Sequence, residues 1–408
     1  MEDTSGTAGD SEGTLDFTGK LLILLSGILS SLCLTAINSV LPTIDKVLAH
    51  TPGDHLLVKQ LFGGVALAMA AGAPLGGYLS DKIGLRRTLF GASLIYVLAG
   101  TAGLYLSSLP FLLASRLLLG LAAAAIQVLG LTMVNTQLSG NARAKWMGLH
   151  VSVAIFGTLL IHPLAGLLGE ISWRLPFALY AGGAALIVGL LFNRGEGAAQ
   201  AAPGQVAAEA SAAAGPGMIS WFPWHYLPLS MFLGAMTFLP TVSIPFQLRQ
   251  QFGATPSTIA YVLTGASLLG AVMALLYGRA RRLLSVHAAF AIGFAVAGTG
   301  ALVAATAQSF AVLLIGLVMH SIGVAWFVPN IMTSLGSKVS KAQQGRATGL
   351  VTAAHFLAAP LAVTLVQPFV KQYGEVIAMK TVAAIGLSMF VVMALRMMPL
   401  RKTGALPG

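Results

Sequence analysis

The stretch GYLSDKIGLRR, from Gly77 to Arg87, holds the most diagnostic pattern in this chain. It places one acidic and three basic residues where two runs without other charged side chains meet, namely Gln60–Ser80 and Thr88–Leu109. A helix needs about 20 apolar residues to cross a bilayer, because its backbone must satisfy its own hydrogen bonds there. The stretch therefore predicts a short charged loop between two membrane-spanning helices.

The rest of the chain has the composition of a membrane protein with many spans. Of its 408 residues, 56% are hydrophobic and 9% are charged, whereas soluble domains have about 25% charged residues. This composition excludes a cytosolic enzyme, a disordered chain and a secreted disulfide scaffold. The net charge of +11 does not indicate nucleic-acid binding, because the Lys and Arg residues lie between apolar runs, where they face anionic lipid. With one cysteine, Cys33, and no Cys/His cluster, neither a metal nor a cofactor is expected.

Twelve apolar runs predict an all-α integral membrane protein with twelve transmembrane helices. They are Leu21–Ile44, Gln60–Ser80, Thr88–Leu109, Phe111–Leu138, Trp146–Gly169, Leu175–Asn193, Met218–Leu248, Pro256–Tyr277, Leu283–Ala307, Ser309–Leu335, Ala347–Val370 and Val376–Leu395. Arg116 is the one charged residue inside a run. Neighbouring runs are divided at Pro110 and near Gln308 with almost no loop.

A segment rich in Ala and Gly divides the runs into two sets of six. We expect one six-helix bundle over residues 20–195, a flexible cytoplasmic linker over 196–217 and a second bundle over 218–398. Residues 1–19 hold five acids before the first base, Lys20, so they predict a disordered tail and not a signal peptide. Residues 399–408 form the other tail.

The basic residues predict the orientation in the membrane. With a cytoplasmic N-terminus, 16 Lys and Arg residues fall on the cytoplasmic side and 6 on the other, and an excess of these residues marks the inner side. Both termini are therefore expected in the cytoplasm. None of the five asparagines is followed by Ser or Thr two residues later, which with the short loops favours a bacterial inner membrane.

The two halves repeat landmarks at one offset. Gly77 precedes the first basic loop and Gly278 precedes the second, 201 residues later. Gly148 and Gly349, each followed by Leu, have the same separation. A parallel repeat of six helices is one known plan of membrane transporters.

The charged loop resembles the signature of the major facilitator superfamily, roughly G-x-L-x-D-[RK]-x-G-[RK]-[RK]-[RK] between spans two and three. The matching residues are Gly77, Asp81, Gly84, Arg86 and Arg87. The resemblance implies two pseudo-symmetric six-helix bundles and assigns these residues to gating, because the loop latches the halves in that family. A carboxylate here can cap a helix N-terminus and pair with arginine.

Three further segments resemble drug and metabolite exporters of that superfamily. Arg116–Gly120 is similar to an R-x-x-x-G motif in span four, and Thr35–Pro42 is similar to the first-span motif of multidrug antiporters. Ser172–Phe177 is similar to the W-R-x-x-F start of span six. There are two departures: Cys33 replaces an acid of the antiporter motif, and His162 interrupts the fifth-span pattern.

Ionisable side chains within the runs are functional candidates, because they are costly in a bilayer. No Asp or Glu lies deep in a run, which argues against a pump for cationic drugs. Arg116 either donates to backbone carbonyls or snorkels outward, or it anchors an anionic substrate group. His320 is favoured for proton or substrate coupling, because histidine titrates near pH 6.5 and span ten lines the cavity in the family. His162 is interpreted first as the partner of a carbonyl freed by Pro163.

Polar and aromatic residues on further inner helices complete the expected solute path. They are Asn38, Gln127, Asn135, Gln247, Asn330 and Trp326. Polar groups also hold membrane helices together, so both roles stay open.

The leading hypothesis is a secondary transporter that works by alternating access, with efflux of a drug or metabolite in exchange for protons. The second is an importer or facilitator of an organic anion, such as a siderophore or carboxylate, that uses Arg116. The third is a membrane sensor without transport, which the intact loop disfavours. No enzyme is expected, since paired acids, a metal cluster and a nucleotide-binding loop are missing from the sequence. We expect a monomer in the lipid bilayer, with a small-molecule substrate and protons as partners.

Overall fold

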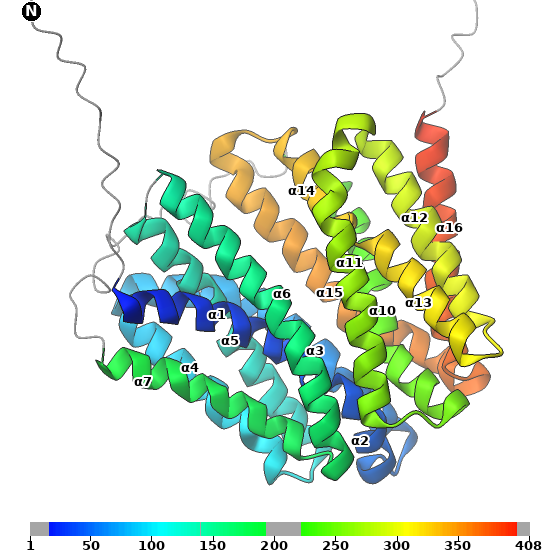
Figure 1. Ribbon diagram of the computed structural model, residues 1–408, viewed down its shortest axis with the longest axis horizontal. Helices are drawn as coiled ribbons and strands as arrows, with labels where there is room; N and C mark the ends of the chain where they lie inside the picture. The colour runs from blue at the N-terminus through cyan, green and yellow to red at the C-terminus, as the bar shows by residue number, and fades with distance from the viewer. Residues whose placement is uncertain (1–15, 139, 193–221, 398–408) are drawn as a thin grey trace, which may run out of the picture. The chain divides into compact units, whose positions relative to one another are not determined.

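The computed structural model describes residues 16–138, 140–192 and 222–397 (Figure 1). The chain divides into two compact units, Met1–Pro216 and Gly217–Gly408. All regular structure within the described ranges is helical. The predicted linker and C-terminal tail lie outside the described residues, as do residues 1–15 of the predicted N-terminal tail.

The first unit contains six spans. Its elements are α1 (Phe17–Thr35), η1 (Asn38–Val40), α2 (Leu41–Leu48), α3 (Pro52–Ile83), α4 (Leu85–Thr101), η2 (Ala102–Leu104), α5 (Leu109–Gln137), α6 (Gly140–Ile171), η3 (Leu175–Gly183) and α7 (Ala184–Phe192). Asp16 caps α1, since its carboxylate accepts from the N–H of Gly19 at 2.8 Å.

The second unit contains the other six spans. Its elements are α10 (Tyr226–Phe252), α11 (Pro256–Leu283), α12 (Val286–Ala305), α13 (Phe310–Val324), α14 (Phe327–Gly336), α15 (Lys341–Tyr373) and α16 (Val376–Met397). Helix α12 packs closely on both α13 and α16 (Figure 1).

Twelve helical segments of the described chain are long and apolar enough to cross a membrane. The predicted all-α membrane fold is therefore confirmed. Both narrow divisions are found, since η2 ends at Leu104 before α5 begins at Leu109, and α12 ends at Ala305 before α13 begins at Phe310. The first lies before the predicted position, because Pro110 belongs to the first turn of α5.

Spans one and ten are each broken near a proline. In span one the break is η1, between α1 and α2, and in span ten it separates α13 from α14. Pro42 in the first turn of α2 has no N–H for the carbonyl of Asn38, four residues earlier. Pro329 has the same relation to Ala325 in span ten. Each break interrupts the backbone hydrogen bonds within a span, where polar groups need other partners.

Glycines allow the central helices of each unit to pack closely. A Cβ at Gly72 of α3 would lie 2.5 Å from the carbonyl oxygen of Leu121 in α5. A Cβ at Gly316 of α13 would lie 2.5 Å from the amide nitrogen of Ala304 in α12. Both distances are too short for any side chain, so these glycines serve helix packing.

Candidate functional site

The charged loop is the junction of α3 and α4, and Gly84 makes the turn. Its φ is 91°, a backbone conformation that residues with a Cβ rarely adopt. The N–H of Gly84 donates to the carbonyl of Ser80 at 2.9 Å, and its own carbonyl accepts from the N–H of Thr88 at 3.1 Å. Gly84 thus ends one helix and begins the next. Gly77 is buried in the last turns of α3.

Asp81 makes no ion pair within the described residues. Its Oδ2 is buried and has no hydrogen-bond partner there, so the pairing with Arg86 or Arg87 considered from the sequence is not seen. Arg86 instead donates from Nη2 to the carbonyl of Leu190 at 2.6 Å. Leu190 lies in the last turn of α7, where carbonyls lack helical donors. The side chain of Arg87 is exposed.

Arg116 lies inside the first unit with no exposed surface. Its Nη2 donates to the carbonyls of Ala99 at 2.8 Å and Gly100 at 2.7 Å. The rings of Phe177 and Tyr180 are both centred 4.9 Å from its guanidinium carbon. Of the two interpretations drawn from the sequence, the structure supports donation to carbonyls, because a solute does not reach this group in the described conformation.

A helix end, not an acid, balances the charge of Arg116. Ala99 and Gly100 lie in the last turn of α4, where free carbonyls carry partial negative charge. The aromatic faces add a favourable cation–π contribution. Gly100 makes room for this arrangement, because a Cβ there would lie 2.4 Å from the Cβ of Tyr180. Arg116 therefore joins α5 to the end of α4.

The motif that resembles W-R-x-x-F also has a structural role. Arg174 donates from Nη1 to the carbonyls of Gly103 at 3.0 Å and Leu106 at 2.9 Å. The ring of Trp173 stacks beneath its guanidinium at 4.3 Å and meets Phe177 edge to face. The motif holds the loop between α4 and α5.

The broken span one contributes buried polar atoms that have no partner. Asn38 and Ser39 are each 1% exposed, and Oδ1 and Oγ respectively make no hydrogen bond to any described residue. His162 of α6 is 5% exposed, and neither ring nitrogen has a partner in this part of the chain. The expected bond from His162 to a carbonyl freed by Pro163 is therefore wrong. These atoms therefore retain hydrogen-bonding capacity for a ligand. A ligand that bonds to them would recover the cost of about 1–3 kcal/mol that each unpaired buried polar group carries.

The packing of α6 brings His162 to the level of the break. Helix α6 contacts both α1 and η1. The two helices run in the same direction, because Gly27 lies against His150 and Ser31 lies against Gly157 further along. His162 follows Gly157 by five residues, which places it level with the end of α1, next to η1. Asn38, Ser39 and His162 thus occupy one level of the first unit.

The remaining polar candidates on spans four and seven differ in burial. On α5, Gln127 is half-buried and Asn135 is exposed, and neither bonds to a described residue. On α10, Gln247 is 1% exposed, and its Nε2 donates to the carbonyl of Ala304 and to Oε1 of Gln251, both at 3.1 Å. Gln247 therefore holds α10 against α12, although its own Oε1 stays unpaired among the described residues.

His320 is buried in the second unit between three helices. Its Nδ1 lies 3.0 Å from the carbonyl oxygen of Ala297 in α12, and its Nε2 lies 2.9 Å from that of Met236 in α10. Both nitrogens of this α13 side chain thus face acceptors. A neutral imidazole donates to one of them, and a protonated imidazole donates to both.

Asn330 and Trp326 are held by hydrogen bonds within the second unit. Oδ1 of Asn330 accepts from the hydroxyl of Tyr277 at 3.0 Å, and Nδ2 donates to the carbonyl of Val286 at 3.0 Å. Nε1 of Trp326 donates to the carbonyl of Met273 at 3.0 Å. These bonds tie α14 and the break before it to α11 and α12.

Two buried features were not found by sequence reasoning. Ser39 was read only as part of a motif, although it adjoins Asn38. Oγ of Ser26 lies 3.1 Å from Nε2 of His150, a contact between residues 124 positions apart for which no local signal exists. No group of three His, Cys, Asp or Glu side chains in the described ranges is arranged to hold a metal ion.

The sequence profile of the Major Facilitator Superfamily matches residues 23–227 and 226–407. The chain belongs to the major facilitator superfamily. Its fold agrees with this: the crystal structure of a D-xylose–proton symporter superposes with a TM-score of 0.75 at 16% identity, over 96% of this chain and 99% of that one.

Curated relatives in the superfamily match part of the chain. The MFS-type transporter pydD of Acremonium sp is 33% identical over 168 residues, which are 40% of this chain and 29% of the relative. The class H tetracycline resistance protein of Pasteurella multocida is 32% identical over 185 residues, which are 43% of this chain and 44% of the relative. The match thus spans less than half the length of each.

Proposed function

We propose that this major facilitator is a secondary active transporter that exports a small organic solute by alternating access in exchange for protons. The names of the two relatives, a transporter and a tetracycline resistance protein, support transport and the outward direction. The substrate class is a neutral or weakly polar organic molecule, since no Asp or Glu lies deep in a span to attract a cation.

The group of unpaired polar atoms at the break in span one carries the proposal. Asn38, Ser39 and His162 offer an amide oxygen, a hydroxyl and an imidazole that are buried and unbonded within the described residues. A solute with two or three polar groups would complete these hydrogen bonds and recover their desolvation cost. Gln127 and Asn135, which are also unbonded there, extend the proposed path along α5.

His320 is the proposed proton carrier. Uptake of a proton adds a second N–H, so that α13 is hydrogen-bonded to α10 and α12 at once. Release of the proton leaves one of the two carbonyls facing a lone pair, which weakens that contact. Protonation would therefore change how three helices of the second unit hold together, and this is the kind of two-state element that coupling requires.

The charged loop is the proposed gate. Gly84 sets the turn between α3 and α4, and Gly77 is buried near the end of α3. The unpaired Oδ2 of Asp81 has capacity for a partner in another conformation. Arg86 and Arg87 complete the loop, and we place this loop on the cytoplasmic side, with both termini, in a bacterial inner membrane. The protein is proposed to act as a monomer, with residues 196–217 as the linker.

Import of an organic anion through Arg116 loses its main support. That guanidinium is fully buried and bound to carbonyls, so it does not face a solute path in the described conformation. The buried His162 and His320 are compatible with either direction, and the experiment below separates the two directions.

The test uses purified protein in liposomes that contain a pH-sensitive dye. A proton gradient is imposed, and cationic, neutral and anionic solutes are added in turn. We expect proton flux that depends on a neutral solute, with solute moving against the proton. His320→Gln should abolish proton flux while solute binding remains, and His162→Leu should abolish both. Arg282→Gln, an exposed base outside these groups, is the matched control and should behave as the wild type.

Other results would overturn parts of the proposal. Movement of solute and proton in the same direction would replace export with import. Solute movement without proton flux would remove the role of His320. Full solute binding by both His162→Leu and Asn38→Leu would remove the proposed solute site.

A further inference from the structure

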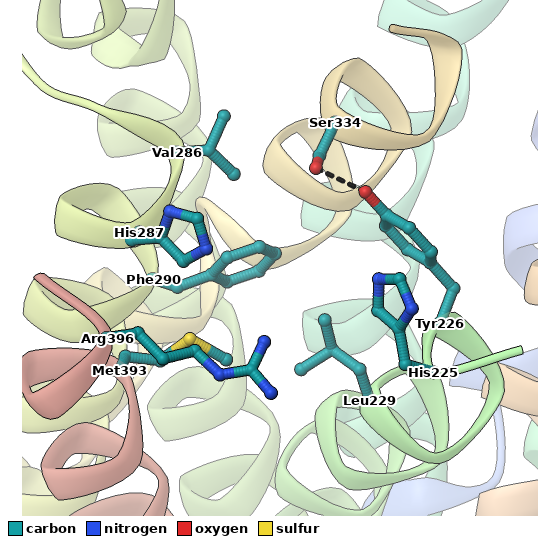
Figure 2. Close-up of a pocket in the computed structure, with 9 residues that line it drawn as sticks. All are labelled: His225, Tyr226, Leu229, Val286, His287, Phe290, Ser334, Met393 and Arg396. Atoms are coloured by element: carbon teal, nitrogen blue, oxygen red, sulfur yellow. Dashed lines mark hydrogen bonds between the residues drawn. The ribbon is translucent and has the colours of Figure 1, made fainter. Parts of the chain in front are cut away.

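A basic pocket lies at one end of the second unit. Figure 2 shows the first turns of α10 and α12 facing the last turns of α14 and α16 around it. Tyr226 is the first residue of α10, and His225 directly precedes it. His287 comes from α12, Ser334 from α14 and Arg396 from α16. The hollow has a volume of about 50 Å³.

The arginine of this pocket has no acidic partner. Arg396 is exposed and makes no hydrogen bond or ion pair with the residues that the structure describes. Glu375 is the single acid in the sequence from residue 217 to 408. It precedes α16, whereas Arg396 lies in the last turn of that helix, about 30 Å away at 1.5 Å per residue. The charge of Arg396 is therefore not neutralised by this unit.

The hydrogen-bonding groups of the pocket suit an acceptor-rich ligand. The Arg396 side chain extends from α16 across the pocket toward the first turn of α10 (Figure 2), and its guanidinium presents a planar set of donors that matches phosphate oxygens. His287 and His225 add imidazoles on two sides, and the hydroxyls of Tyr226 and Ser334 are bonded to each other at 2.5 Å. The starts of α10 and α12 also carry the positive ends of their helix dipoles.

The floor and surroundings of the pocket are apolar. Leu229, Phe290 and Met393 line it. Two large apolar side chains at the same end of the unit are exposed, Leu283 by 88% and Leu395 by 59%, and such surface in a membrane protein contacts lipid. The pocket therefore lies where a spanning helix bundle passes from hydrocarbon to headgroups.

We infer that this pocket binds a phosphate group, held by Arg396 and His287 with His225 at its edge. The phosphate can belong to the headgroup of an anionic phospholipid or be free in solution, and both sources present the same oxygens to the same donors. The site is separate from the proposed solute path and gate, which involve none of these residues.

Binding is expected to strengthen as the pH falls. Partial burial lowers the pKa of His225, and the charges of Arg396 and Lys338 lower it further. The groups that face His225 are His287 from α12, Arg396 from α16 and Lys338 after α14. A bound phosphodiester keeps its single negative charge over this range and favours the protonated imidazole, so its affinity should rise as the pH falls from about 8 to about 5.

The test measures binding to the full-length protein and needs no transport substrate. Inorganic phosphate is titrated into protein in a neutral detergent, and thermal unfolding reports binding. Separately, the protein is reconstituted in nanodiscs of phosphatidylcholine with or without phosphatidylglycerol, and native mass spectrometry counts the retained lipids. Arg396→Gln should weaken binding by about tenfold or more. Arg282→Gln should have no effect, because Arg282 is an exposed base in the last turn of α11 and does not line the pocket.

The two arms identify the source, and a failure of both overturns the inference. Retention of phosphatidylglycerol that Arg396→Gln abolishes supports a lipid headgroup. A phosphate response without lipid selectivity supports a soluble phosphate. If Arg396→Gln lowers the yield of folded protein, His287→Gln serves as the second variant. Equal binding of both ligands by wild type, Arg396→Gln and His287→Gln would overturn the proposed site.

Discussion

Asn38 and Asn330 are both asparagines at the break of a span, and they are 1% and 0% exposed. The amide of Asn330 is bonded on both sides, to Tyr277 and to Val286, whereas Oδ1 of Asn38 has no partner in the described chain. The same contrast separates His320, whose two nitrogens face carbonyls, from His162, whose two nitrogens face none.

This contrast distinguishes side chains that hold helices together from side chains that remain available. A buried polar group without a partner destabilises the unit by about 1–3 kcal/mol, and a partnered one contributes about 1 kcal/mol. Loss of a partnered residue should therefore lower stability. Loss of an unpartnered one should leave stability unchanged or raise it, because the desolvation penalty is removed, and should weaken ligand binding.

Arg116 combines both behaviours in the first unit: its Nη2 is bonded to two carbonyls, whereas its Nε and Nη1 are buried without a hydrogen-bond partner in the described chain. Arg116→Met keeps much of the volume but leaves two carbonyls at the end of α4 without a donor. The free energy of unfolding should fall by about 3 kcal/mol. Thermal or denaturant unfolding in detergent measures this loss. Arg87→Met, at an exposed site, is the control and should change stability by less than about 0.5 kcal/mol.

A stable Arg116→Met protein with weak solute binding would contradict the structural role. It would support the other interpretation, in which Arg116 contacts the solute.

The two histidines test the contrast directly. His320→Leu removes the contacts with Ala297 and Met236 and should lower the free energy of unfolding by about 1–3 kcal/mol. His162→Leu removes no hydrogen bond to a described residue, so it should not lower the free energy of unfolding and could raise it by about 1 kcal/mol, while solute transport is lost. Unfolding and uptake assays on the same preparations give both values. Equal destabilisation by the two substitutions would end the distinction.

The charged loops of the two units offer a functional comparison. Asp81 and Arg282 occupy corresponding positions at the offset of 201 residues. Asp81→Asn should reduce the transport rate by about tenfold at near-normal expression, because an unpaired buried carboxylate oxygen is lost from the proposed gate. Arg282→Gln should keep the rate within about twofold, since that base is exposed. Initial transport rates of the two variants in liposomes, corrected for the amount of protein, make the comparison. Full transport by Asp81→Asn would exclude the proposed gate.

Two glycines near these loops should show the smallest effect. Gly84→Ala forces a side chain into a φ of 91° and should cost about 1 kcal/mol of stability. Gly278→Ala lies within α11, where a Cβ meets nothing within 4 Å, and should be neutral or stabilise by up to about 1 kcal/mol. Paired melting curves measure the difference. A more stable Gly84→Ala would show that the turn tolerates a side chain.

Most of the fold was predictable, and the reason is local. Each span is a long apolar run, and only a helix satisfies such a backbone in lipid. The loop motif pointed to the family, and Gly84 fills the position that the motif requires. The site was less predictable: Arg116, His162 and Asn38 were recognised as unusual from their place in a span, but their partners were not.

The sequence alone therefore determined twelve helices, their division into two sets of six and the polar residues within them, because these depend on neighbours along the chain. The tertiary structure decided which polar residues are partnered. His320 meets Met236 across 84 residues, and Asn330 meets Tyr277 across 53. Such contacts depend on how helices pack and rotate within a unit. The sequence of one helix alone does not determine its rotation or its neighbours.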